Sequence, residues 1–90
     1  MTPSQPTVNW GAYYYKVKEL YSAQDYAQAA EMSKAALNEF PEIYELWEML
    51  GASNIQIGDL EEASIAFEQA ISIKPHVPQG HNNLGLTYRE

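Results

Sequence analysis

The sequence predicts an all-α protein made of antiparallel helix hairpins stacked side by side. Three observations predict this fold class. The chain matches itself after a shift of 34 residues, apolar residues recur three or four apart, and capping or breaking residues separate the expected helices. A period of this length indicates a solenoid, in which each unit buries its apolar face against its neighbour. We expect about 2.4 units and five helices between residues 10 and 90.

The 34-residue shift aligns residues of similar type at positions that have the same structural role in each unit. Small residues fall on small residues, capping residues on capping residues and prolines on prolines. The aligned positions are Asp25 with Asp59, Ala29 with Ala63, Ala36 with Ala70, Pro41 with Pro75, Tyr13 with Trp47 and His81, and Leu50 and Gly51 with Leu84 and Gly85.

The first hairpin follows a short lead-in. Residues 1–9 carry two prolines and small polar side chains, so we expect them to be disordered. A first helix is expected over about 10–23, where Tyr13, Val17 and Leu20 are three or four apart. Asp25 is placed to cap a second helix over about 26–39, because its carboxylate accepts the free amide hydrogens of the first turn. Pro41 then discourages further helix.

The second hairpin repeats this plan. A helix is expected over about 44–57, and Gly58 gives the following turn a residue that tolerates a positive φ. Asp59 is placed to cap a helix over about 60–73, and Pro75 ends the pair. Pro78 is suited to the first turn of a last helix, over 78–90.

Small residues within these helices predict close helix packing. They stand at Ala29, Ala36, Gly51, Ala63, Ala70 and Gly85. In the second hairpin we expect Trp47 to pack over Ala63 and Phe67 and to bury on the order of 200 Å² of indole surface.

The second unit resembles the tetratricopeptide repeat family. It supplies the family's W-x2-L-G as Trp47, Leu50 and Gly51, and only Asn54 departs, where the family usually has tyrosine. The further matches are Gly58, Ala63, Phe67, Ala70 and Pro75. The first unit is looser, with Val17 for glycine, Gln24 for the turn glycine and Ser33 for phenylalanine. The resemblance implies a right-handed superhelix with repeats at 10–43 and 44–77 and a partial repeat at 78–90.

Composition excludes several function classes. Five lysines and arginines stand against twelve aspartates and glutamates, a net charge of -7 that repels nucleic acid and anionic membranes. No run of 18 apolar residues predicts a membrane span, and residues 1–9 do not form a signal peptide. The chain has no cysteine. A cytoplasmic protein without a cofactor is the resulting expectation.

No motif predicts catalysis or metal binding. His76 and His81 are five residues apart and lie off a common helical face, which disfavours a shared metal ion. Glu61 and Glu62 begin a helix and are better explained as charges that favour its dipole. The serines have no nucleophile motif and the glycines form no phosphate-binding loop. We therefore expect a protein without enzymatic activity.

Candidate binding residues come from the face opposite the core of each first helix. By family resemblance, this face lines a concave groove that binds a peptide or a partner protein. The expected contacts are Tyr14, Lys18, Tyr21, Glu45, Glu48, Asn82, Asn83 and Arg89. The two glutamates would prefer a basic residue of the partner. An ordinary solvated helix face is the alternative explanation.

Two known groove chemistries of the family need particular residues on this face. The carboxylate clamp for acidic chaperone tails would need lysine at Tyr14 and at Gln79, asparagine at Lys18 and at Met49, and arginine at Asn83, and none of these matches. The asparagine ladder that grips a peptide backbone would need asparagine at Tyr15, Met49 and Asn83, and only Asn83 fits. The sequence therefore disfavours chaperone-tail binding.

The sequence is also compatible with other functions. The incomplete third unit suggests the N-terminal part of a longer array, and it would also allow a homo-oligomer in which a second chain covers the exposed end. The repeats could instead dock substrates for an enzyme located further along the chain, such as a glycosyltransferase or a sulfotransferase. Self-assembly through the repeat ends is a third reading.

Overall fold

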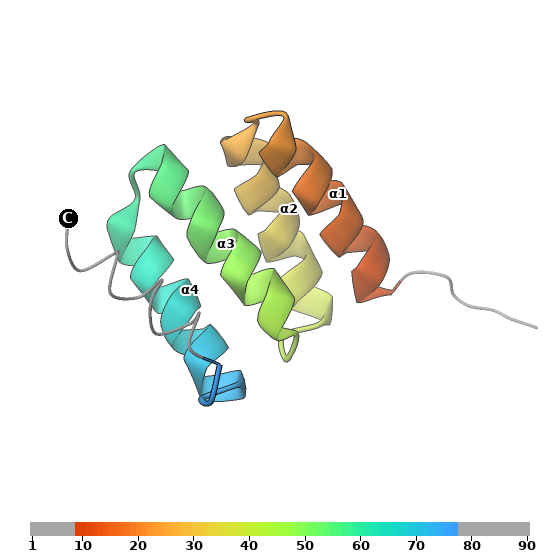
Figure 1. Cartoon of the computed structure of the whole chain (residues 1–90). Coiled ribbons are helices and arrows are strands. Elements are labelled where there is room, and N and C mark those ends of the chain that lie inside the picture. Colours follow the sequence, from red (N-terminus) through yellow and green to blue (C-terminus); the bar gives the residue numbers. More distant parts are fainter. Residues whose placement is uncertain (1–8, 78–90) are drawn as a thin grey trace, which may run out of the picture.

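The computed structural model describes residues 9–77, which form four α-helices. They are α1 (Trp10–Ser22), α2 (Tyr26–Glu39), α3 (Tyr44–Ile57) and α4 (Leu60–Ile73), as Figure 1 shows. The predicted ranges of the four helices are confirmed, with α1 one residue shorter than expected. The fifth helix expected over 78–90 and most of the lead-in lie outside the described residues.

Side-chain caps begin three of the four helices. Asp25 Oδ1 accepts from the Gln28 amide at 3.3 Å, and Asp59 Oδ1 accepts from the Glu62 amide at 3.2 Å, so both predicted caps are confirmed. Asn9, which the sequence assigned to the lead-in, caps α1 by accepting from the Ala12 amide at 3.1 Å. The start of α3, at Ile43, has no side-chain cap.

The two hairpin turns have the same backbone geometry 34 residues apart. Gly58 has a φ of 96° and Gln24 a φ of 65°, both in the left-handed region. In each turn the amide of the following aspartate donates a hydrogen bond to a carbonyl in the last turn of the preceding helix. The Asp59 amide donates to Asn54 O and the Asp25 amide donates to Leu20 O, at 2.9 Å in both cases. Gln24 therefore adopts a conformation that normally favours glycine.

The packing of the helices shows an open stack. Each helix contacts the next one in the chain, and α1 also contacts α3. Within residues 9–77, α4 contacts neither α1 nor α2. A closed four-helix bundle would bring α1 against α4. The all-α solenoid predicted from the sequence is therefore confirmed, and the stack fans open on the α2–α4 side.

Close helix approach depends on small residues, as the sequence predicted. Ala29, Ala36, Ala63 and Ala70 are fully buried. A methyl group built on Gly51 would stand 2.5 Å from the Phe67 ring, so α3 and α4 approach each other only because this residue has no side chain. Half-buried Trp47 packs against the core and donates from Nε1 to the Pro41 carbonyl at 2.7 Å. Its expected contact with Ala63 and Phe67 stays a prediction.

The first hairpin has the opposite residue sizes at the two equivalent positions. Val17 is equivalent to Gly51 and Ser33 is equivalent to Phe67, and both residues are fully buried. The Ser33 hydroxyl donates to the Ala29 carbonyl at 2.8 Å, so its buried polar group is satisfied. At these positions the first hairpin therefore has a larger residue on α1 and a smaller one on α2, whereas the second has a small residue on α3 and a large one on α4.

The turn geometry leads to a paired stability prediction. We expect Gln24→Gly to raise the free energy of unfolding by about 0.5 to 1 kcal/mol, because glycine adopts a positive φ without steric cost. Gly58→Ala should lower it by about 1 kcal/mol. No atom lies within 4 Å of the added methyl group, so this second effect comes from the backbone alone. Urea unfolding of both variants measures the changes, and a destabilised Gln24→Gly would contradict the explanation.

Candidate functional site

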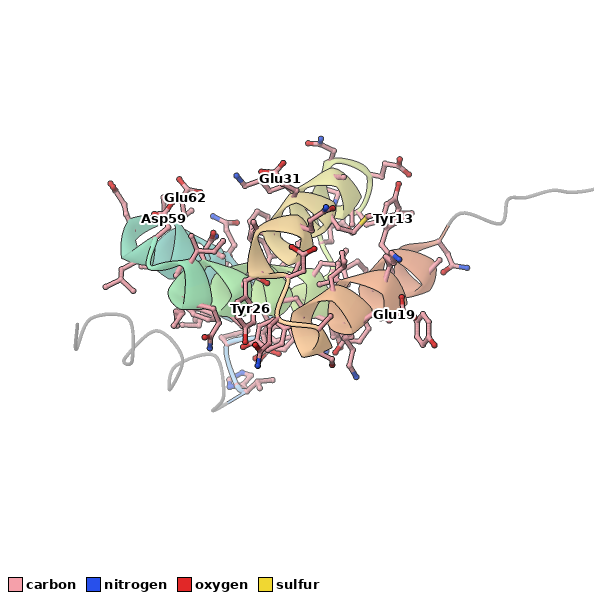
Figure 2. All side chains as sticks on the ribbon, turned by 90° about the horizontal axis from the view of Figure 1, so that it is seen from above. Tyr13, Glu19, Tyr26, Glu31, Asp59 and Glu62 are labelled. Atoms are coloured by element: carbon pink, nitrogen blue, oxygen red, sulfur yellow. The ribbon has the colours of Figure 1, made fainter. Side chains whose placement is uncertain are left out.

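The surface shared by α1 and α3 is the inner face of the stack. The two helices contact each other on this side, while α2 and α4 diverge on the other, so the first helices of the hairpins line the inside of the curve. In Figure 2 Glu31 and Glu62 lie along one side of the molecule, and Glu19 and Tyr26 lie toward the opposite side. The sequence predicted the binding residues on this inner face.

Aromatic and basic side chains of α1 form the first part of the inner face. The Trp10 and Tyr14 rings have centroids 5.8 Å apart in a tilted arrangement. Lys18 Nζ lies 5.3 Å from the centroid of the Tyr14 ring, within the range of a cation–π contact. Tyr14 is half-buried and Lys18 is exposed, so this cluster offers an aromatic surface with a charged edge.

A second cluster joins the start of α3 to the end of α4. The Tyr44 hydroxyl donates to Glu48 Oε2 at 2.9 Å, across one turn of α3. Lys74, which follows α4, lies with its Nζ 3.6 Å from Glu45 Oε2 and 5.0 Å from the centroid of the Tyr44 ring. One ammonium group thus contacts both a carboxylate and an aromatic ring.

Electrostatics connects the two clusters. Burial raises the pKa of Tyr14, and the negative charges of Glu45 and Glu48 raise it further. These carboxylates are therefore close enough to disfavour a Tyr14 phenolate. Burial, the hydrogen bond to Glu48 and the charges of Glu48 and Glu45 raise the pKa of Tyr44 to about 12. Both tyrosines stay neutral, and the glutamates give this part of the inner face its negative charge.

Tyr21 marks the other end of the inner face. Its hydroxyl accepts a hydrogen bond from Gln56 Nε2 at 3.4 Å, which links the ends of α1 and α3. Its ring meets the Tyr26 ring edge to face, with centroids 5.1 Å apart. This contact ties the inner face to the start of α2.

The structure places five of the eight predicted contacts on α1 and α3. Glu45 and Glu48 lie close enough to Tyr14 for their charges to raise its pKa, Lys18 lies beside Tyr14, and Tyr21 lies near the opposite end. Asn82, Asn83 and Arg89 lie outside the described residues.

Sequence reasoning missed two members of the site, Tyr44 and Lys74. Tyr44 precedes Glu48 by four residues, and this helical spacing could have indicated their contact. Lys74 gives no such signal, because its contact with Glu45 joins the end of one helix to the start of another.

The side of α2 and α4 carries a separate hollow of about 570 Å³. Its lining is mostly apolar and includes one lysine and one glutamate. The lining residues are Lys34, Leu37, Asn38, Pro41, Trp47, Leu50, Glu62 and Ile65.

Residues 9–77 contain no group of three or more histidines, aspartates or glutamates arranged to hold a metal ion. No helix in the same part of the chain is long and apolar enough to cross a membrane.

The open stack of helix hairpins defines the molecule as an α-solenoid. The model of the tetratricopeptide repeat family matches residues 20–84, which is most of the chain. This protein belongs to the tetratricopeptide repeat family. A search of curated proteins finds no match. Members of the family are in general non-catalytic scaffolds for protein–protein interactions.

The environment of Tyr44 predicts a specific dependence of stability on pH. The unfolded chain loses its tyrosine proton near pH 10, whereas the folded protein keeps the Tyr44 proton until a pH of about 12. The stabilisation by the neutral phenol is therefore complete below about pH 10 and is lost as the pH rises toward 12. When the pH is raised from about 9 to about 11.5, the free energy of unfolding should fall less for Tyr44→Phe than for the wild type. The difference should be on the order of 1 to 2 kcal/mol.

Urea unfolding at the two pH values measures this difference. Tyr15→Phe is the matched control, because it removes a hydroxyl from a ring that is 70% exposed. An equal loss of stability in the wild type and in Tyr44→Phe would contradict the role of Tyr44.

Proposed function

We propose that the protein is an interaction scaffold that binds a peptide or a partner protein across the inner face of α1 and α3. The hairpins correspond to repeats at 10–43 and 44–77. The observation that carries the proposal is that Glu45 and Glu48, more than 30 residues away in sequence, lie close enough to Tyr14 for their charges to raise its pKa. Family membership supports the protein-binding role in general.

The inner face is suited to binding because its side chains are already held in place. Tyr14 is in contact with Trp10 and Lys18, and Tyr44 is fixed by its bond to Glu48. A partner would therefore not have to order these groups, a cost that otherwise reduces affinity. Tyrosine and tryptophan rings are also the side chains that contribute most at interfaces.

The charge of the face indicates the chemistry of the partner. The charges of Glu45 and Glu48 raise the pKa of Tyr14, and the whole chain has a net charge of -7. A lysine or arginine of the partner could pair with a carboxylate and stack on a ring at the same time. We therefore propose a basic segment as the ligand. Contacts with Asn82, Asn83 and Arg89, and the cytoplasmic location, stay predictions.

A peptide selected on the immobilised protein tests the proposal. Random peptides displayed on phage should yield sequences enriched in lysine or arginine. The double variant Glu45→Ala with Glu48→Ala should then bind the selected peptide about 3- to 30-fold more weakly, because two partly exposed ion pairs are lost. Fluorescence anisotropy with the labelled peptide measures the affinity.

The control is the double variant Glu31→Ala with Glu62→Ala. It changes the net charge by the same amount on the side away from Tyr26 and Glu19 (Figure 2). Its affinity should stay within about 2-fold of the wild type. If the two double variants weaken binding equally, the inner-face site is wrong and only general charge attraction remains.

A further inference from the structure

The Lys74 ammonium group is held by side chains from the neighbouring helix. Its Nζ lies 5.0 Å from the centroid of the Tyr44 ring and 3.6 Å from Glu45 Oε2. Tyr44 and Glu45 are adjacent at the start of α3, while Lys74 immediately follows α4. This combination of an aromatic ring and a carboxylate is a receptor for an organic cation.

The receptor is more rigid than the group it holds. The Tyr44 side chain is buried, with 7% of its surface exposed, and its hydroxyl is fixed by the hydrogen bond to Glu48. Lys74 is attached through four flexible methylene groups, and its side chain is 48% exposed. An exposed lysine pair of this kind contributes little to stability and is readily exchanged. The ring and the carboxylate therefore form the site, and Lys74 is its replaceable occupant.

The position of Glu45 makes this exchange relevant to binding. Glu45 contacts Lys74 on one side, and its charge acts on Tyr14 of α1 on the other. A partner that crosses the inner face from α1 to α3 would meet Glu45 while Lys74 is bound to it. A cation of the partner must then compete with an ammonium group of the protein itself.

We propose that Tyr44 and Glu45 form a subsite for a lysine or arginine side chain of the partner, and that Lys74 occupies this subsite in the free protein and leaves it on binding. This inference rests on the proposed function and adds to it a defined ligand group and an internal competitor. Arginine is the preferred occupant, because its planar guanidinium stacks on a ring and pairs with a carboxylate at once.

N-acetyl-arginine amide is a simple probe for the subsite. Titration of the 15N-labelled protein, followed by NMR chemical shifts, measures its affinity without any knowledge of the natural partner. Lys74→Ala should bind the probe about 3- to 30-fold more tightly than the wild type, because the internal competitor is gone. The largest shift changes should fall on Tyr44 and Glu45.

Lys16→Ala is the matched control for charge. Lys16 is an exposed lysine paired with Glu19 at 3.5 Å within α1, so its removal changes the net charge as much as Lys74→Ala does. Affinity for the probe should stay within about 2-fold of the wild type. Adding Tyr44→Leu to Lys74→Ala should remove the gain, because the ring is lost while the carboxylates remain.

Several results would overturn the inference. They are equal affinities of Lys74→Ala and Lys16→Ala, undetectable binding of the probe to Lys74→Ala, or a gain that persists without the Tyr44 ring. If the Glu45 and Glu48 double variant still weakens binding of the selected peptide in these cases, the proposed function stands and only the role of Lys74 is wrong. If that variant has no effect on the peptide, the proposed function itself fails.

Discussion

The close approach of α3 and α4 at Gly51 and Phe67 is the constraint on which the arrangement of the molecule depends. The Phe67 ring occupies the space that any side chain at position 51 would need. At the equivalent positions the first hairpin has Val17 and Ser33, both fully buried, so the larger and the smaller residue stand in the opposite order. Interiors are close-packed, and a change of size on one helix requires the opposite change on its partner.

This packing determines where the inner face lies. Once each hairpin is closed tightly, α1 and α3 meet and α2 and α4 diverge, and the stack bends around the side of α1 and α3. In this arrangement the charges of Glu45 and Glu48 of one hairpin raise the pKa of Tyr14 of the other. Neither hairpin alone contains the proposed site. The binding surface is therefore a product of repeat stacking, as expected for a solenoid.

Sequence reasoning was most successful where structure depends on local chemistry. The caps at Asp25 and Asp59 and the left-handed turn at Gly58 follow from residues next to each helix end. It treated Val17 and Ser33 as separate departures from the family pattern, because only the folded hairpin shows that both residues are fully buried. Spacing placed Tyr14, Glu45 and Glu48 on one face. It could not supply Lys74, whose reach to Tyr44 depends on how α4 ends beside the start of α3.

The free energy of unfolding of Gly51→Ala tests the packing constraint most directly. In an open helix, this substitution would stabilise the protein by about 1 kcal/mol, because alanine favours helix more than glycine does. The account predicts the opposite sign, a loss of about 1 to 3 kcal/mol, because the methyl group meets the buried Phe67 ring at 2.5 Å. In a Phe67→Leu background, which lacks the outer ring atoms, the loss should shrink by at least about 1 kcal/mol. A stabilised Gly51→Ala, or the same change in both backgrounds, would contradict the account.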